Sequence, residues 1–453
     1  MADDGVNAPA AGRWLGTGAA LLVAVRVAAV LSTAGVTVAV ARLLGPSLSG
    51  DYALMVALVV ALTTLCGLGI DSGVVWLLSR REWGASSAFL TTQLAAAPLG
   101  AVGAGAGLGL YLITREDAFG GIDAAAAIVA LASVPLSVGW LYAAQVALAR
   151  GEYGRTAAIR AAFPALSLVL VPPLAAAFEL TGAVAGVLGA NAGAWILAVG
   201  LRPPSEPRGA RVDLDRLRAA VRFGIRPYLA NTLGFVIFRF DFFVLSAAAG
   251  SAEVGFYAAA VAMANLLTLA PGGLGGALFP RLAARSASEP DRGLEARGIR
   301  HAVLAVLATA PLLAAGIALL LEPLFGSRFA PAVTPALILV PGTAALGVAA
   351  ALYSILLGRG RPDLTLRAAV IVAPLAMALY LALIPPLEAE GAAIASTISY
   401  LASAAVAGRY VRALTRLPVR DLVLPRHSDL VDYREAARRF AAFVRGRRDE
   451  GGG

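Results

Sequence analysis

Lysine is absent from this chain of 453 residues, in which all 37 basic residues are arginine. Without lysine, the chain can contain neither a G-x-x-x-x-G-K phosphate-binding loop nor a lysine Schiff base. The single cysteine, Cys66, excludes an intrachain disulfide. The two histidines, His301 and His427, are too few for the usual zinc sites. We therefore expect no metal site, no cofactor and no catalytic residue.

Charged residues are also scarce, at 14% of the chain, and the mean hydropathy is +0.78. An average soluble domain has about a quarter of its residues charged. The apolar runs repeatedly exceed the roughly 20 residues that cross a bilayer as a helix. The sequence predicts an all-α polytopic membrane protein with about 12 transmembrane helices, at 17–44, 52–79, 88–113, 124–149, 157–178, 182–201, 227–249, 255–280, 301–321, 332–357, 365–385 and 391–411.

The arginines are distributed unevenly among the loops between these spans. Eighteen lie in even-numbered loops, whereas the odd-numbered loops hold only Arg115 and Arg328. Loops rich in arginine stay on the cytoplasmic side of a membrane. This asymmetry predicts a multi-pass protein of the plasma membrane with both termini in the cytoplasm.

The longest internal break divides the chain into four parts. Spans one to six form an N-terminal lobe at 1–201, and spans seven to twelve form a C-terminal lobe at 227–413. Between them, residues 202–226 place Leu214, Leu217 and Val221 at helical spacing among arginines. This pattern predicts an interfacial amphipathic linker on the cytoplasmic side. The basic tail, 414–453, is also amphipathic, and we expect it to bind anionic membrane lipids or a partner protein.

The two lobes repeat each other in sequence. "GPSLSGDY" at 45–52 aligns with "GSAEVGFY" at 250–257, with an offset of 205 residues. "LYAAQVALARG" at 141–151 resembles "LYSILLGRG" at 352–360, and "GAVAG" at 182–186 resembles "GAAIA" at 391–395. Six spans per repeat give both lobes the same orientation. A pseudo-twofold axis along the membrane normal, with a site between the lobes near the midplane, is expected.

These segments carry a family resemblance. "LLGPSLSGDYALMVALVVALTTLCGLGIDSGVVWLLSR" resembles the opening of the polysaccharide-biosynthesis flippases, which belong to the multidrug/oligosaccharidyl-lipid/polysaccharide exporter superfamily. "FRFDFFVLSAAAGSAEVGFYAAAVAMANLLTLAPGGLGGALFPRLA" is similar to the start of that family's second lobe, and "GRGRPDLTLRAAVIVAPLAMALYLALIPPLEAEGAAIASTISYL" to its C-terminal segment. The resemblance implies a V-shaped, two-lobe transporter with alternating access, and not an enzyme. Lipid II flippases of this superfamily usually have fourteen spans, so a count of twelve argues against that branch.

Charges deep in a span are the candidate site residues, because each costs about 2.5–3.5 kcal/mol to insert. Arg26 lies about nine residues into the first span and Arg239 about twelve into the seventh. We expect both to bind substrate, the alternative being structural ion pairs. Asp71 follows two glycines, and we expect it to cap a restarting helix or to pair with Arg26.

Three further polar residues are expected to have structural or coupling roles. Asp241 is two residues from Arg239, and residues two apart on a helix point about 200° away from each other. Asp241 should therefore face another helix while Arg239 faces the aqueous cavity. Asn191 and Asn231 are candidates both for hydrogen bonds between helices and for cavity-lining positions.

The leading functional hypothesis is a flippase that moves a lipid-linked saccharide precursor from the inner to the outer leaflet. Arginine binds phosphate through a bidentate fork, so the expected partner is a lipid-linked anionic oligosaccharide, with membrane lipids and other glycan-assembly proteins beside it. No nucleic acid partner is expected. The alternatives are a cation-coupled multidrug exporter of the same superfamily and a membrane enzyme of polysaccharide synthesis. Span one carries Arg26 and no acid, which disfavours the exporter.

Overall fold

The described part of the chain, residues 8–204, 209–269, 292–416, 418 and 420 of a computed structural model, contains helices and turns but no strand. The all-α multi-pass class predicted from the sequence is confirmed. The helices of the N-terminal half are α1 (Ala8–Cys66), α2 (Ile70–Ser79), α3 (Ala85–Thr114), α4 (Ala124–Leu131), α5 (Ser133–Ala149) and α6 (Tyr153–Gly200). Those of the second half are α7 (Leu214–Ala249), α8 (Ser251–Asn265), α10 (Arg292–Phe325), α11 (Val333–Gly358) and α12 (Pro362–Thr415), with short 3₁₀ helices at Leu266–Thr268 and Ser327–Ala332.

Eight helical segments of the described residues are long and apolar enough to cross a membrane. Three of them, in α1, α6 and α12, contain a sharp break in the helical backbone, at Gly45, at Phe178–Glu179 and at Glu388. In α6 the two arms pack against each other, because Gly182 faces Leu174 and Gly193 faces Leu166. The expected eighth span, 255–280, lies partly outside the described residues, so the count of about twelve stays a prediction.

The internal repeat is visible in the backbone. Gly45 (φ 76°, ψ −178°) and Gly250 (φ 83°, ψ 179°), which are 205 residues apart, adopt the same conformation. Glu179 (φ 50°, ψ −132°) and Glu388 (φ 49°, ψ −128°) also match. The left-handed region suits glycine because a Cβ clashes there, which explains why both lobes have glycine at the first turn. The two halves of the chain therefore share these two turns of the backbone.

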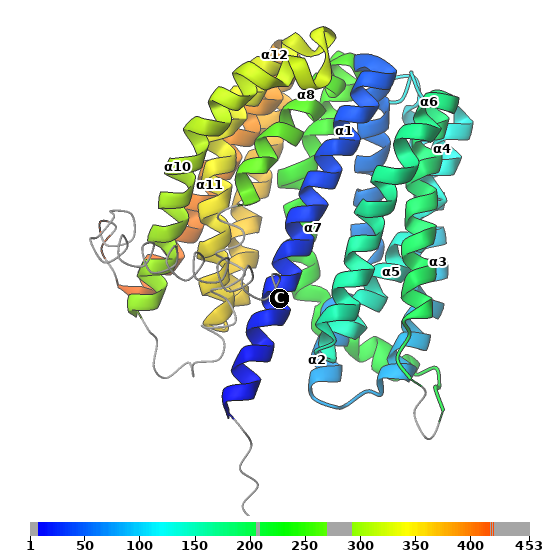
Figure 1. Ribbon diagram of the computed structural model, residues 1–453, viewed down its shortest axis with the longest axis vertical. Helices are drawn as coiled ribbons and strands as arrows, with labels where there is room; N and C mark the ends of the chain where they lie inside the picture. Colours follow the sequence, from blue (N-terminus) through cyan, green and yellow to red (C-terminus); the bar gives the residue numbers. More distant parts are fainter. Residues whose placement is uncertain (1–7, 205–208, 270–291, 417, 419, 421–453) are drawn as a thin grey trace, which may run out of the picture.

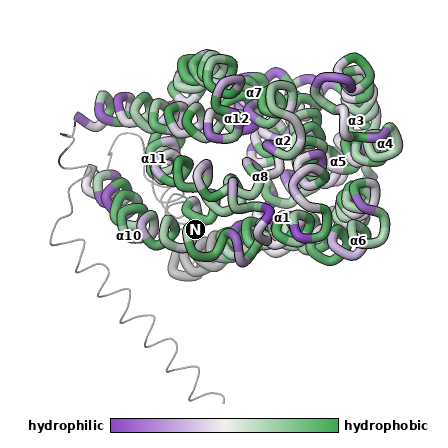
Figure 2. The backbone as a smooth tube through the Cα atoms, turned by 90° about the horizontal axis from the view of Figure 1, so that it is seen from above, coloured by the Kyte–Doolittle hydropathy of each residue, from purple (hydrophilic) through white to green (hydrophobic). Residues whose placement is uncertain are grey.

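The helices form two groups joined by a central set (Figure 1). Helices α3 to α6 lie at one side of the molecule, α10 to α12 lie at the other, and α1, α7 and α8 lie between them. Seen from above, α10 and α11 are far from α3, α4 and α6, and apolar residues predominate along the tube (Figure 2). α1 turns back at the top of Figure 1, whereas α2 and the start of α7 are at the bottom.

The segment before span seven differs from the separate linker that the sequence predicts for 202–226. Residues 214–226 are the first turns of α7, which continues through Pro227 to Ala249. Asp213 caps this helix, because its Oδ1 accepts a hydrogen bond from the amide of Arg216 at 2.9 Å. Ala220 is fully buried and its backbone lies against Gly73 of α2. Leu217 and Val221 of these turns pack on the N-terminal lobe beside Ala220, whereas Leu214 is exposed, so α7 contacts both lobes.

The basic tail predicted at 414–453 lies mostly outside the described residues. α12 ends at Thr415, where Arg416 adopts a left-handed conformation (φ 58°). Its role in binding lipids or a partner stays a prediction.

Candidate functional site

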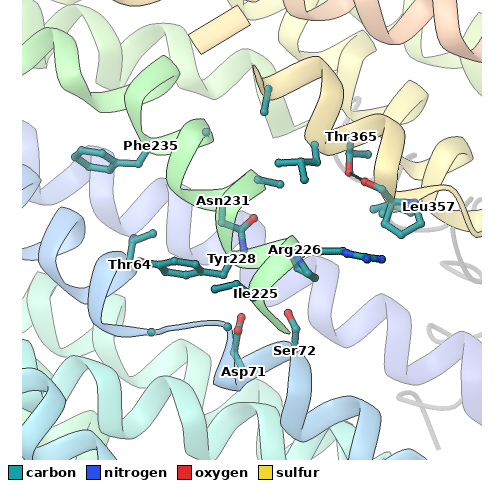
Figure 3. Close-up of a pocket in the computed structure, with 18 of the residues that line it drawn as sticks. Thr64, Asp71, Ser72, Ile225, Arg226, Tyr228, Asn231, Phe235, Leu357 and Thr365 are labelled. Carbon is teal, nitrogen blue, oxygen red and sulfur yellow. Dashed lines mark hydrogen bonds between the residues drawn. The ribbon is translucent and has the colours of Figure 1, made fainter. Parts of the chain in front are cut away.

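A large cavity lies between the two lobes (Figure 3). Its volume is about 1590 Å³, which exceeds the roughly 300–1,000 Å³ of typical small-molecule pockets. Helices α1, α2 and α5 form one wall, and α7, α11 and α12 form the other. The lining includes Arg222 near the start of α7, and Gly360, Pro362 and Asp363 where α11 gives way to α12. The cavity therefore extends to the end of the molecule that carries the arginine-rich loops.

The charges that line this cavity are mainly cationic. The lining arginines are Arg222, Arg226, Arg239 and Arg367. The lining acids are Asp71 and Asp363, and Asp363 is neutralised by Arg361 through two hydrogen bonds of 2.9 Å. Partly enclosed walls of one charge concentrate ligands of the opposite charge. The cavity thus favours an anion.

Arg239 lies deep in the cavity, about 20 Å along the helix axis from Arg226 at 1.5 Å per residue. It also borders a second, smaller pocket of about 170 Å³ whose walls are mostly apolar residues of α1 and α8. Its guanidinium carbon is 5.7 Å from the ring centroid of Phe242, a cation–π geometry. Within the described residues, Arg239 forms no ion pair. Its guanidinium is therefore available to an anionic ligand.

Asp241 points away from the cavity and is 1% exposed. Its Oδ2 accepts hydrogen bonds from the hydroxyl of Tyr257 on α8 at 2.5 Å and from that of Ser396 on α12 at 3.1 Å. Tyr380 of α12 also donates to the backbone oxygen of Ile237 at 2.5 Å. These bonds join three helices of the C-terminal lobe. The charges at 239 and 241 thus face different environments, and their separate roles stay predictions.

Arg26 and Asp71 are not brought together. Arg26 is exposed on α1 and lines neither the large cavity nor the small pocket. Asp71 does line the cavity, in the first turn of α2. The helix does restart after the glycines, but its N-cap is Gly69 and the side chain of Asp71 forms no capping bond. No ion pair joins Arg26 to Asp71 in the described part of the chain, and substrate binding by Arg26 stays a prediction.

The two candidate asparagines occupy different environments. Asn231 is exposed on α7 and lines the cavity, beside Tyr228 in Figure 3. Asn191 is 2% exposed, and its Oδ1 accepts hydrogen bonds from Ser137 at 2.7 Å and from Trp140 at 3.0 Å. Asn191 therefore joins α5 to α6 inside the N-terminal lobe, away from the cavity.

Sequence reasoning did not single out three of the four cavity arginines. Arg222 and Arg226 fall within the predicted linker, and Arg367 lies near the end of a predicted span, where it could reach the interface. The four-residue spacing of Arg222 and Arg226 was the available signal, because it places both on one helix face. Only the folded arrangement, in which α7 crosses between the lobes, turns that face toward the cavity.

The opposite end of the molecule is closed by direct contacts between the lobes. Gly50 on α1 and Gly255 on α8, which are equivalent in the repeat, pack backbone to backbone, so that a Cβ on either would overlap the other helix. Beside them, the hydroxyl of Ser251 donates to Oδ1 of Asp51 at 2.5 Å. Only glycine permits so close an approach. We call this set of contacts the outer contact.

Three further hydrogen bonds support the outer contact. The hydroxyl of Ser246 at the end of α7 donates to the backbone oxygen of Ala118 at 2.6 Å. Arg42 of α1 donates to the backbone oxygen of Leu324 at 2.6 Å and to that of Pro323, at the end of α10. An arginine satisfies the free carbonyls of a helix C-terminus and its partial negative charge. The molecule is thus closed at this end and hollow toward the other.

Comparison with known proteins identifies the family. The model of the polysaccharide biosynthesis protein family matches residues 39–334. A search of curated proteins found no match. An inward-facing multidrug resistance MATE family transporter of the MOP superfamily is similar in structure, with a TM-score of 0.69 and 15% identity over 86% of this chain and 94% of that one.

Two other solved structures are similar over most of their length. The lipid II flippase MurJ, in an inward closed conformation, gives a TM-score of 0.68 at 12% identity over 87% of each chain. A MOP superfamily transporter from Pyrococcus furiosus gives 0.66 at 16% identity over 88% of this chain and 95% of that one. At these identities the likeness shows the fold. The chain belongs to the polysaccharide biosynthesis protein family, and it has the fold of the MOP superfamily transporters.

Proposed function

We propose that the protein is a flippase that moves a lipid-linked anionic saccharide from the inner to the outer leaflet of the plasma membrane. The observation that carries this proposal is the cationic cavity of about 1590 Å³ between the lobes. Its volume suits a head group larger than a drug, and its four arginines suit phosphate, which arginine binds bidentately. Membership of the polysaccharide biosynthesis family supports a saccharide ligand.

Alternating access supplies the transport step. In the conformation described here, the cavity extends to the arginine-rich end and the outer contact closes the other end. With both termini in the cytoplasm, the cavity would receive its ligand from the inner leaflet. Opening of the outer contact would then release the head group outside. The chain carries the ligand without making or breaking a bond in it.

Arg239 is the residue on which we test this proposal. A hydrogen bond to a charged group contributes about 1.5–3 kcal/mol, so removing one should weaken ligand binding by roughly 10- to 150-fold. Arg239→Gln should therefore abolish surface glycan in cells that lack the native gene, while a membrane immunoblot shows normal abundance. Lipid-linked precursor should accumulate facing the cytoplasm.

The control is Arg218→Gln, because Arg218 is exposed and so is Asp215, with which it forms an ion pair at 3.0 Å. It should complement fully. Normal surface glycan with Arg239→Gln at normal abundance would refute the role of this arginine. Normal glycan in the deletion strain, together with increased sensitivity to cationic drugs, would instead support the multidrug exporter.

A further inference from the structure

The two walls of the cavity differ in chemistry. Among the residues that the structure describes, every arginine of the lining comes from α7 or α12. The wall formed by α1, α2 and α5 contributes no arginine. Its polar side chains are hydroxyls, one amide and one carboxylate, from Thr63, Thr64, Asp71, Ser72, Tyr142 and Gln145. We call this surface the hydroxyl wall.

The break between α1 and α2 exposes polar groups on the hydroxyl wall. α1 ends at Cys66 and α2 begins at Ile70, and the turn between them lines the cavity through Gly67 and Gly69. Asp71 and Ser72, in the first turn of α2, point toward the cavity beside Ile225 (Figure 3). One turn before the break, the hydroxyl of Thr63 is buried and has no hydrogen-bond partner. Its oxygen is enclosed, so the contacts that this stretch offers to a ligand come from Asp71 and Ser72.

Neighbouring side chains hold this wall in place and leave donors available. Gln145 accepts a hydrogen bond of 3.4 Å from Arg160, which is not a lining residue, so its amide nitrogen can donate into the cavity. The hydroxyl of Tyr142 donates to the backbone oxygen of Gly67 at 3.0 Å. The hydroxyl of Tyr228, from α7, donates to the backbone oxygen of Leu65 at 3.0 Å, and Tyr228 lines the cavity with its ring. The wall thus offers both donors and acceptors beside an aromatic face.

This chemistry suits a polyol and not a phosphate. A carboxylate accepts hydrogen bonds from two hydroxyls and repels an anion, so phosphate is drawn to the arginines of the facing wall. We infer that the hydroxyl wall is the saccharide subsite, with Asp71 accepting bonds from sugar hydroxyls while the phosphate lies against α7 and α12. This assignment rests on the proposed function and specifies which part of the ligand each wall of the cavity binds.

Binding of two ligands by the purified full-length protein tests the assignment. The first is the pool of lipid-linked saccharides extracted from the cells that make this protein. The second is a synthetic isoprenyl phosphate that carries no sugar. Native mass spectrometry reports both the mass and the occupancy of each bound lipid. We expect the wild type to prefer the intact lipid, and Asp71→Asn to reduce that preference about tenfold, the effect of losing roughly one charged hydrogen bond.

Two variants separate this subsite from the rest of the site. Arg239→Gln should weaken the binding of both lipids by the same factor, because Arg239 contacts the phosphate that both carry. Asp215→Asn, an exposed carboxylate on the first turn of α7, should change neither. The inference is overturned if Asp71→Asn leaves the preference for the intact lipid unchanged, or if it weakens the binding of both lipids equally. Wild-type protein that binds neither lipid would remove the proposed function, and the subsite with it.

Discussion

The outer contact provides the most specific prediction about transport. A Cβ on Gly255 would overlap the carbonyl oxygen of Pro46 and lie 2.9 Å from its carbonyl carbon. Carbon atoms pack best at about 3.5–4.0 Å, so α1 and α8 must separate by roughly 1 Å to accept an alanine. Because the two helices belong to different lobes, this cost falls on the closed state alone.

The size of the effect follows from the cost of overpacking. Forcing a methyl group into a packed interface costs about 1–3 kcal/mol. Applied to one of two conformations, that cost shifts their ratio by about 5- to 150-fold. Gly255→Ala should therefore raise the fraction of molecules that are open at the outer contact, and slow transport because the return to the closed state is impeded.

Spin-label distances measure this shift directly. Labels at Glu116→Cys and Ser327→Cys, on a Cys66→Ala background, report the separation of the lobes beside the outer contact, since both residues are exposed and lie on different lobes. Gly255→Ala should move the distribution to longer distances. The matched control is Gly316→Ala on α10, where a Cβ meets nothing within 4 Å. If both Gly255→Ala and Gly316→Ala give the wild-type distribution of spin-label distances, the outer contact is not a gate.

Three further predictions concern stability and topology. Asp241→Ala removes the acceptor of two buried hydroxyls, which should lower the free energy of unfolding by about 1–3 kcal/mol. The melting temperature and the abundance of the protein should fall, and an Asp241→Ala protein as stable as the wild type would contradict this. Arg359 pairs with the buried Glu295 through two hydrogen bonds of 2.6 Å. Arg359→Gln should therefore lower the free energy of unfolding by about 3 kcal/mol, measured by thermal unfolding. Adding Glu295→Gln should restore most of that stability. A cysteine at the exposed Val212, on a Cys66→Ala background, should resist an impermeant thiol reagent in intact cells and react in inverted vesicles; labelling in intact cells would reverse the predicted topology.

The sequence predicted the class and the repeat because both depend on local pattern. Apolar runs of membrane length indicate helices, since a chain in lipid must satisfy its own backbone hydrogen bonds. The match of "GPSLSGDY" with "GSAEVGFY" indicates a repeated turn in the two halves, and the similar backbone angles of Gly45 and Gly250 agree with that repeat. Helical rotation likewise separated Arg239 from Asp241 before any tertiary contact was known.

Tertiary structure decided what no local pattern contains. Whether Arg222 and Arg226 face lipid, solvent or ligand depends on the path of α7 across both lobes, and hydropathy says nothing about that path. The partner of Asp71 was also undetermined, because a pairing with Arg26 depends on how α1 and α2 are placed in space. The sequence by itself therefore determined the helices, their repeat and the face on which each charge lies. Only the packing of the lobes decided which of those faces enclose the cavity and which close its outer end, because both depend on contacts between residues far apart in the chain.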